Sequence, residues 1–420
     1  MLSNISTPLV GMVDAAVVGH LPDHHLLAAV NLGAASISLL FFMFGFLRMG
    51  TSGLVAQAFG ANDQQALRST FQRALAIAFV AGTVLALLQG PLSHISAALA
   101  DSAAPAELIS DYLSYRLSAA PLALAAMVTT AVLIAVDRAG AAVAIQIAAN
   151  GLNMALDVVF VHQLGMTVDG VALASAIAES SACLAGLWML RGYLRRGQSG
   201  PSQSWTLLFK VNRDIFVRST LLVAVFYSLT AISGHFGSLA LAACGVLLNL
   251  FYLCSYALDG FAHAAEVQAG HAFGARSPAD FRQSIRAATF WALVFAAGMS
   301  LCLWLFGEQL IALQSDNPNV RAFAYEQLLW FVFLPLLGVA AFLLDGIFIG
   351  TTHSTEMRNG MILATVVYLF ALPAVKLWEI HGLWLAFSTF MIARGVILLL
   401  YYPRLTRGLA SACSSNPVTP

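Results

Sequence analysis

Long apolar runs, separated by short polar or charged clusters, follow one another along the whole chain. A helix needs about 20 apolar residues to cross the hydrocarbon core of a bilayer. Segmenting the chain on charges, prolines and polar clusters gives twelve such runs, so the pattern predicts twelve transmembrane helices. They lie at residues 2–21, 31–59, 68–90, 107–135, 139–162, 168–191, 214–236, 241–268, 283–306, 321–349, 358–376 and 381–402.

The longest polar stretch separates the sixth run from the seventh and indicates a linker between two halves. We therefore expect an N-terminal lobe at 1–191, a cytoplasmic linker at 192–213, a C-terminal lobe at 214–402 and a cytoplasmic tail at 403–420. Sequence markers recur between the halves. The motif AFGA at Ala58–Ala61 returns 214 residues later at Ala272–Ala275, and Pro121 matches Pro335 at the same offset. Two parallel copies of a six-helix unit follow, as in transporters built from parallel repeats.

Basic residues set the orientation of a polytopic protein, because cytoplasmic loops carry the excess of Lys and Arg. Arg321, Lys376 and Arg116, the last near a helix entrance, fall on one side, and Arg48 and Arg394 sit within apolar runs. The rest fall on the other side: Arg68, Arg73, Arg138, Arg191, Arg195, Arg196, Lys210, Arg213, Arg218, Arg276, Arg282, Arg286, Arg358, Arg404 and Arg407. Both termini and the linker are therefore expected in the cytoplasm.

Composition strengthens the membrane assignment and removes other classes. Sixty per cent of the 420 residues are apolar and 10% are charged, against about 25% charged in an average soluble chain. The mean hydropathy is +0.82. The 20 basic and 20 acidic residues cancel, so no net charge favours a nucleic-acid partner. The five cysteines show no CxxC spacing, which argues against a zinc site or a disulfide framework, and no cleavable signal peptide is expected.

An ionisable side chain inside the membrane indicates function by default, because keeping it there costs at least a few kcal/mol. Asp14 stands in the middle of the first run and shares a helical face with Thr7. Pro8 removes a backbone hydrogen bond from the same helix, so we expect a bend there. Asp14 is therefore a candidate functional carboxylate.

The fifth run carries four polar residues at spacings i, i+4, i+7 and i+11, which place them on one stripe of a helix. They are Gln146, Asn150, Asn153 and Asp157. One polar residue could be helix-packing glue, but four in register predict the wall of a wet cavity. In the sixth run Ser175 and Glu179 lie one turn apart. Ser175 could supply a further oxygen, and Glu179 is expected near a helix–helix contact.

The second half does not repeat these acids. At the offset of 214, Asp14 corresponds to Ser228 and Asp157 to Ala371. The acids of that half lie toward cytoplasmic helix ends near turns, where water is expected to reach them, and we interpret them as gate residues or structural anchors. They are Asp259, Glu266 and Asp345. An ion site is therefore expected in the first lobe alone.

Five separated motifs resemble the multidrug and toxic compound extrusion (MATE) transporters, specifically the DinF-like branch. They are PLVGMVDAAVVGHL, LRMGTSGLVAQAFGA, NGLNMALDVVFV, ALDGFAHAAEVQAGHAFGA and LLDGIFIGTTHSTEMRN. The resemblance implies twelve helices in two lobes, in a multi-pass protein of the bacterial cytoplasmic (inner) membrane. It also implies export of amphipathic, often cationic compounds against inward flow of H⁺ or Na⁺. The family's cation site falls on Asp14, Asn153 with Asp157, and Ser175.

These observations predict an antiporter with no cofactor besides its coupling ion, small-molecule substrates, a lipid surround, no nucleic-acid partner and a monomeric state. The proton is the preferred ion, because Na⁺ needs five or six oxygens; Na⁺ at Asp14, Asn153 and Asp157 is the alternative. A lipid-precursor flippase of the same fold is the main rival, although a diphosphate head group calls for a more basic cavity. A major-facilitator transporter is a second alternative, but the loop FGANDQQALRS lacks the DRxGRR pattern of that family. A membrane enzyme such as a prenyltransferase is a third, but the chain lacks the DDxxD cluster that would hold Mg²⁺ and diphosphate, so we expect no enzyme.

Overall fold

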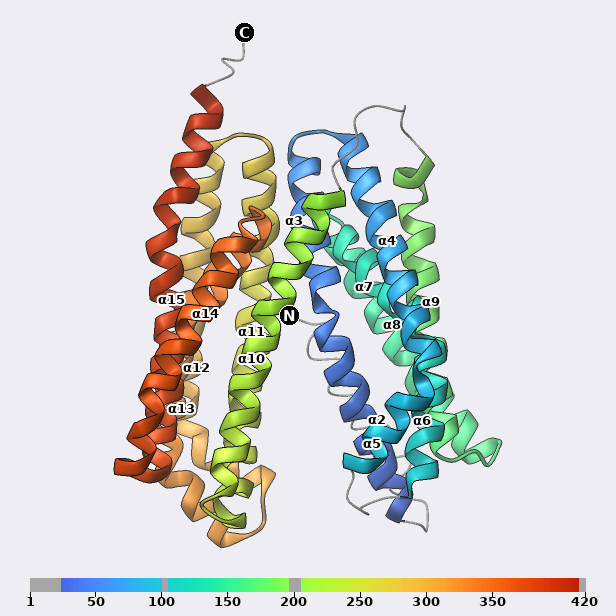
Figure 1. Ribbon diagram of the computed structural model, residues 1–420, viewed down its shortest axis with the longest axis vertical. Coiled ribbons are helices and arrows are strands. Elements are labelled where there is room, and N and C mark those ends of the chain that lie inside the picture. The colour runs from blue at the N-terminus through green and yellow to red at the C-terminus, as the bar shows by residue number, and fades with distance from the viewer. Residues whose placement is uncertain (1–23, 100–104, 196–204, 415–420) are drawn as a thin grey trace. The chain divides into compact units, whose positions relative to one another are not determined.

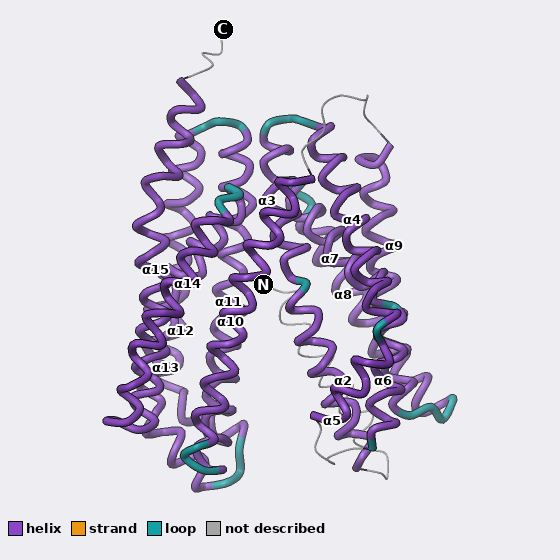
Figure 2. Tube along the Cα trace, viewed as in Figure 1, coloured by secondary structure: helices purple, strands orange, loops and turns teal. Residues whose placement is uncertain are grey.

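The computed structural model describes residues 24–99, 105–195 and 205–414, and over those ranges the chain forms helices joined by short turns (Figures 1 and 2). Contacts divide it into two units. Apart from the turn Gly60–Asn62, which is assigned to the second unit, the boundary lies between Leu208 and Phe209. This boundary falls within the expected linker at 192–213, although helices extend into that segment from both sides.

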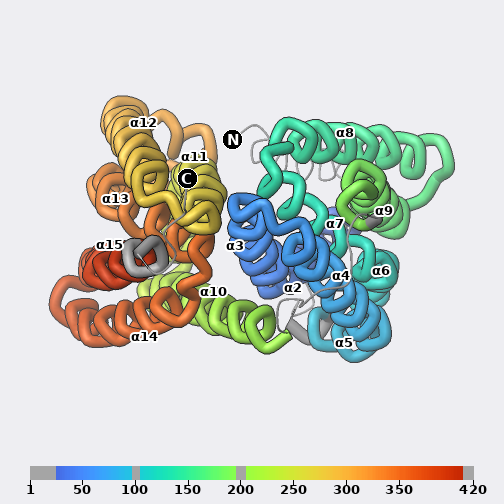
Figure 3. Tube along the Cα trace, turned by 90° about the horizontal axis from the view of Figure 1, so that it is seen from above, coloured from blue at the N-terminus to red at the C-terminus, as the bar shows by residue number. Residues whose placement is uncertain are grey.

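The first unit holds the helices of the N-terminal lobe. They are α2 (His24–Met43), α3 (Gly45–Gly60), α4 (Gln64–Leu87), α5 (Gln89–Leu99), α6 (Ala106–Ser118), α7 (Ala120–Ala135), α8 (Ala139–Val158), the π-helical turn η1 (Val159–Gln163) and α9 (Val168–Arg195). Within this unit α9 packs against α6, α7 and α8, and α4 packs against α7 (Figure 3). The helix α9 is therefore central to the packing of the lobe.

The second unit holds the helices of the C-terminal lobe. They are α10 (Trp205–Gly234), α11 (Ser238–Gly274), α12 (Pro278–Gln314), α13 (Pro318–Gly350), α14 (Ser354–Ala371), the 3₁₀ turn η2 (Leu372–Ala374) and α15 (Val375–Ser414). Here α13 packs against α11, α12 and α15, and α14 packs against α15. The helix α15 continues twelve residues past the expected end of the last transmembrane run, into the segment interpreted as a tail.

The spans agree with the predicted twelve. In the described ranges nine helices are long and apolar enough to cross a membrane, and the bent pair α6–α7 makes a tenth. One candidate, Ser354–Leu409, covers two predicted runs, because the chain turns at η2 and breaks at Trp378 and Glu379, where φ of Glu379 is +49°. The first run, 2–21, lies outside the described residues. The described residues thus account for eleven of the twelve predicted spans, in an all-α polytopic membrane protein of two units.

The surface of the helices is apolar where lipid would cover it. On α12 the side chains of Leu301 and Trp304 are 53% and 67% exposed, whereas the small residues Ala292 and Ala296 are buried. A soluble protein rarely exposes such a face. Large residues facing outward and small residues at helix contacts are typical of membrane bundles.

The turn after each AFGA motif shows the internal repeat at the level of the backbone. Asn62 and Arg276, 214 residues apart, both adopt positive φ, at +55° and +52°. The next residues, Asp63 and Ser277, each donate their backbone N–H to the carbonyl five residues earlier at 2.9 Å. Each also caps the following helix with its side chain. The two halves therefore share a residue in the left-handed backbone conformation and a helix N-cap, although the residues at these positions differ in the sequence.

Two predicted continuous runs contain breaks. The run 31–59 divides into α2 and α3 around a turn at Phe44, and the run 107–135 divides into α6 and α7 with a bend of 52°. Pro121 sits in the first turn of α7, where its missing N–H breaks no helical bond. A Cβ added to Gly82 of α4 would lie 2.3 Å from the Cα of Pro121. The bend therefore presses the start of α7 against the backbone of α4.

Candidate functional site

The predicted polar stripe of the fifth run lies along α8 and becomes more buried toward the end of that helix. Gln146 and Asn150 are half-buried, and the Gln146 Nε2 donates a hydrogen bond to the Asn150 Oδ1 at 3.0 Å. Asn153 is 3% exposed and Asp157 is fully buried. Polar groups on this face therefore point into the lobe rather than toward lipid.

A direct contact links this stripe to the sixth run. The Asn153 Nδ2 donates a hydrogen bond to the Ser175 Oγ of α9 at 3.2 Å. The Asn153 Oδ1 is buried and has no hydrogen-bond partner among the described residues. Asp157 follows Asn153 by one helical turn on the same face of α8. The structure thus gathers three of the four residues that the family resemblance assigns to the cation site.

A π-helical turn begins two residues after this carboxylate, and no pattern in the sequence predicts it. The turn η1 starts two residues after Asp157, and the Leu164 N–H reaches back five residues to the Val159 carbonyl at 3.1 Å. Such turns are rare and are frequent at functional sites. The end of α8 is therefore locally unwound where it carries a fully buried acid.

The remaining predicted members of the first-lobe site lie outside the described residues. These are Thr7, Pro8 and Asp14, so their placement stays a prediction. Among the described residues, no three His, Cys, Asp or Glu side chains come together as a metal site would require. The described oxygens of the candidate site belong to Asn153, Asp157 and Ser175.

Glu179, one turn beyond Ser175 on α9, forms an ion pair. Its Oε1 accepts a hydrogen bond from the Arg116 Nη2 of α6 at 2.7 Å, and the side chains are 33% and 8% exposed respectively. The prediction that Arg116 lies near a helix entrance is wrong. Arg116 is buried among helices and lies two residues before the end of α6. The expectation of a helix–helix contact at Glu179 agrees with this pair.

The second-lobe acid Asp345 lies in a cluster of buried charges rather than near water. Its Oδ2 accepts hydrogen bonds from Arg218 of α10 and from the Arg394 Nη2 of α15, the latter at 2.7 Å. The three side chains are at most 8% exposed. Asp259 of α11 is half-buried. The prediction that water reaches Asp345, made from its position near a helix end, is therefore wrong.

The other expectation for this lobe, that its acids sit beside turns, is also wrong. Glu266 lies inside α11, is 1% exposed, and has its Oε2 3.4 Å from the His263 Nδ1 one turn earlier. The GIFIG segment belongs to α13, and its glycines form a close helix crossing. A Cβ added to Gly346 or Gly350 would lie 2.2 or 2.0 Å from the backbone oxygen of Ala262 or Glu266. Two glycines four residues apart let helix backbones approach in this way.

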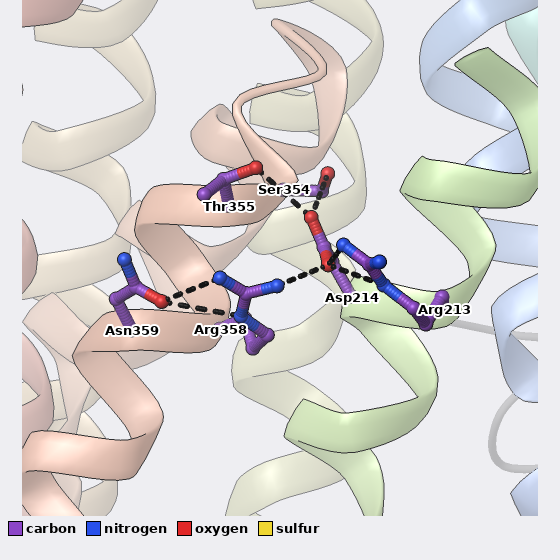
Figure 4. A network of polar contacts seen from close by, with 6 residues as sticks. All are labelled: Arg213, Asp214, Ser354, Thr355, Arg358 and Asn359. Atoms are coloured by element: carbon purple, nitrogen blue, oxygen red, sulfur yellow. Dashed lines mark hydrogen bonds and ion pairs between the residues drawn. The ribbon is translucent and has the colours of Figure 1, made fainter. Parts of the chain in front are cut away.

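A further buried carboxylate escaped the sequence analysis because it stands among loop arginines. Figure 4 shows Asp214 of α10 between two arginines and the first turn of α14. Its Oδ1 accepts from the Arg358 Nη1 at 2.7 Å and from the Arg213 Nη2 at 2.9 Å. Its Oδ2 accepts from the hydroxyls of Thr355 and Ser354 at 2.9 and 3.2 Å. Both oxygens are satisfied, so Asp214 is a structural anchor between α10 and α14.

The chain resembles transporters of the same architecture throughout its length. A structure of MATE in the bent conformation covers 99% of this chain and 94% of its own, with a TM-score of 0.88 at 18% identity. The bent form of VcmN from Vibrio cholerae covers 97% of this chain and 95% of its own, with a TM-score of 0.86 at 20% identity. These structures share the fold of this chain.

Sequence comparison identifies the family. The model of the MatE family matches residues 1–159 and 215–375. DNA damage-inducible protein F of Escherichia coli is 40% identical over 412 residues, covering 96% of this chain and 90% of that protein. The probable multidrug resistance protein NorM of Bradyrhizobium diazoefficiens is 26% identical, covering 97% and 92% respectively. The chain belongs to the MatE family. Its 40% identity to DNA damage-inducible protein F confirms the predicted resemblance to the DinF-like branch.

Proposed function

We propose that this protein is a secondary antiporter that exports amphipathic, cationic organic compounds in exchange for protons. Relatives named multidrug resistance protein NorM and multidrug export protein MepA support the export of drugs. The observation that carries the exchange mechanism is Asp157, a fully buried acid one turn from the Asn153–Ser175 bond. A charge at such a position costs several kcal/mol unless it is compensated. Binding a proton there removes the charge and permits the surrounding helices to repack.

The internal repeat supports Asp14 as the partner of this acid. Its counterpart Ser228 on α10 has its Oγ 2.8 Å from the Tyr368 hydroxyl of α14. At the offset of 214, Tyr368 corresponds to Met154, beside Asn153. The correspondence supports packing of the first helix against α8 near Asn153. In this proposal Asp14 lies close to the stripe, and Pro8 permits the first helix to bend as the pair gains or loses its proton.

The proton is favoured over Na⁺ by the number of available oxygens. The described side chains offer four: two from Asp157, one from Asn153 and one from Ser175. Na⁺ prefers five or six, so a sodium site would need further ligands from Asp14, backbone or water. We place the protein in a bacterial inner membrane as a monomer with both termini in the cytoplasm. Reporter fusions to either end can test the location of the termini.

The decisive experiment uses purified protein in liposomes with a fluorescent cationic substrate. Transport is driven first by an imposed pH step and then by a Na⁺ gradient at constant pH. We expect efflux to follow the pH step, and Asp157→Asn and Asp14→Asn each to abolish it at normal membrane levels. Asp316→Asn, at a fully exposed acid of the second lobe, is the matched control and should transport normally. Efflux that follows only Na⁺ would overturn the choice of ion, and full activity of Asp157→Asn would overturn the site.

A further inference from the structure

The ion pair between Arg116 and Glu179 lies next to the proposed ion site along a chain of direct contacts. Arg116 of α6 holds Glu179 of α9 at 2.7 Å. One turn back on α9, Ser175 receives the hydrogen bond from Asn153, and one turn further along α8 lies Asp157. Each step is a direct contact or a single helical turn. The pair is therefore connected to the ion site without any intervening element.

The pair also occurs only in the lobe that holds the candidate site. At the offset of 214, Arg116 corresponds to Trp330, and at the offset of 212 that relates the sixth and twelfth helices, Glu179 corresponds to Met391. The packing of the second lobe thus needs no ion pair at this position. The buried charges of the second lobe, Arg218, Asp345 and Arg394, lie at other positions. A charge pair that is largely withdrawn from water is a weak source of stability, so its place beside the candidate site favours a role in that site.

Arg116 has a further feature that suits it to control the site. It lies two residues before the end of α6, just ahead of the 52° bend into α7. Its guanidinium also sits over the ring of Phe41 on α2, 5.9 Å from the ring centre. One side chain therefore ties α2, α6 and α9 together at the bend, and any movement of α6 reaches α9 through Glu179.

We propose that Arg116 is a positioning residue for the ion site, which acts by holding Glu179 so that α9 presents Ser175 to Asn153. This inference rests on the proposed function. The same pair sets the charge around the site, because Glu179 and Arg116 neutralise each other. Separating them leaves a net charge inside the lobe, close to the acid that binds the coupling ion.

The geometry gives the size of the effect. Asp157 and Glu179 lie on opposite sides of the Asn153–Ser175 bond, each one turn away, so they are about 12 Å apart along the helix axes. At an effective dielectric constant of about 20, two unit charges at that separation interact by an amount equivalent to about a tenfold change in affinity. Loss of an outer partner that orients a binding group has effects of about 10–100-fold in metal sites.

Other ionisable groups near the pair are few. On α6, Tyr112 lies one turn from Arg116, and the nearby Asp111 and Tyr115 are exposed. On α9, Cys183 lies one turn from Glu179, and α8 contributes Asp157. The helix α7, which also packs against α9, has no ionisable residue, and those of α2 and α4 lie within their first ten residues. A change of charge in the pair is therefore felt mainly at the proposed site.

The test measures the apparent affinity for the coupling proton, as the pH of half-maximal efflux in liposomes, separately from the maximal rate. Glu179→Gln leaves Arg116 as an uncompensated cation, because arginine keeps its charge, so we expect about a tenfold weaker affinity, or about one pH unit. The double variant Arg116→Gln/Glu179→Gln restores neutrality and should recover most of that shift. The loss that remains measures positioning. Arg394→Gln, which removes an equally buried arginine from the second lobe, is the matched control and should not shift the affinity.

An unchanged affinity in Glu179→Gln, with less protein in the membrane, would show that the pair is only structural. A shift of equal size in Arg394→Gln would also overturn the inference, because it would show a general loss of packing. Failure of the proposed function gives a different result: Asp157→Asn would then stay coupled to the pH step. If Asp157→Asn is uncoupled and Glu179→Gln is normal, the inference about Arg116 alone is wrong. Arg116→Lys provides a second variant should the neutral substitution fail to fold.

Discussion

Replacing Asp345 by asparagine should destabilise the second lobe far more than any surface change. The carboxylate is the shared partner of Arg218 and Arg394, and all three side chains are at most 8% exposed. The substitution keeps the shape but leaves two buried guanidinium groups without their counter-charge. Removing one partner of a buried ion pair costs about 3–5 kcal/mol, so the free energy of unfolding should fall by about that amount.

The measurement is unfolding of the purified protein by SDS titration in mixed micelles, followed by tryptophan fluorescence. Asp316→Asn is the control, since that acid is paired with Arg321 at 3.1 Å but is fully exposed. Water and salt screen such a pair, and its loss should leave the unfolding curve unchanged. The two variants remove the same kind of charge from the same helical lobe and differ in burial.

A triple substitution separates the loss of a pair from the loss of the whole cluster. Replacing Arg218, Asp345 and Arg394 together by apolar residues of similar volume removes every buried charge at once. Such replacements are often neutral or stabilising, so the triple variant should unfold at least as late as Asp345→Asn and close to the wild type. If Asp345→Asn unfolds like Asp316→Asn, the charges are solvated and the argument from burial is wrong.

Three further predictions concern helix contacts. Asp214→Asn should destabilise the protein, because Asp214 is fully buried with both oxygens bonded. Arg213→Gln should have little effect, since the Arg213 side chain is 62% exposed, and the same SDS titration compares the two variants. Gly346→Val should reduce the amount of folded protein in the membrane, because even a Cβ at this glycine would approach a backbone oxygen to 2.2 Å. Tyr368→Phe should lower the free energy of unfolding by about 0.5–1.5 kcal/mol through loss of its hydrogen bond to Ser228, again measured in SDS.

The sequence predicts features that depend on periodicity and misses those that depend on distant partners. The stripe ending at Asp157 is readable because a helix places residues 3.6 apart on one face, and hydropathy reveals the spans because no water satisfies the backbone within lipid. The partners of Asp345 are different: Arg218 lies 127 residues away, and in the sequence its charge indicates only the cytoplasmic side of the seventh run. The close contact between Gly82 of α4 and Pro121 of α7 also joins residues far apart in the sequence, so no local pattern encodes it.

Local signals also misled where charges lie close to helix ends. An acid near the end of an apolar run was expected to meet water, yet Glu266 is 1% exposed. The two glycines after Asp345, Gly346 and Gly350, favour a turn when only the sequence is considered, whereas in a membrane bundle glycines are common where two helices cross closely. Glycines of this kind therefore occur both in turns and in close helix crossings, and the position of the neighbouring helix, which the local sequence does not contain, distinguishes the two cases.

The two lobes should differ in what their acids do, and this prediction can be tested by comparing coupling rather than stability. Asp345 is already balanced by two guanidinium groups, so a proton or Na⁺ would have to displace an arginine to bind there. Asp157 instead is fully buried one turn after Asn153, whose amide bonds the Ser175 hydroxyl, and we expect a proton bound there to change the net charge of the lobe. With efflux normalised to folded protein, Asp345→Asn and Asp259→Asn should keep their response to a pH step, although turnover falls, and Asp157→Asn should lose it. Complete uncoupling by either second-lobe substitution, with Asp157→Asn still coupled, would place the ion site in the second lobe.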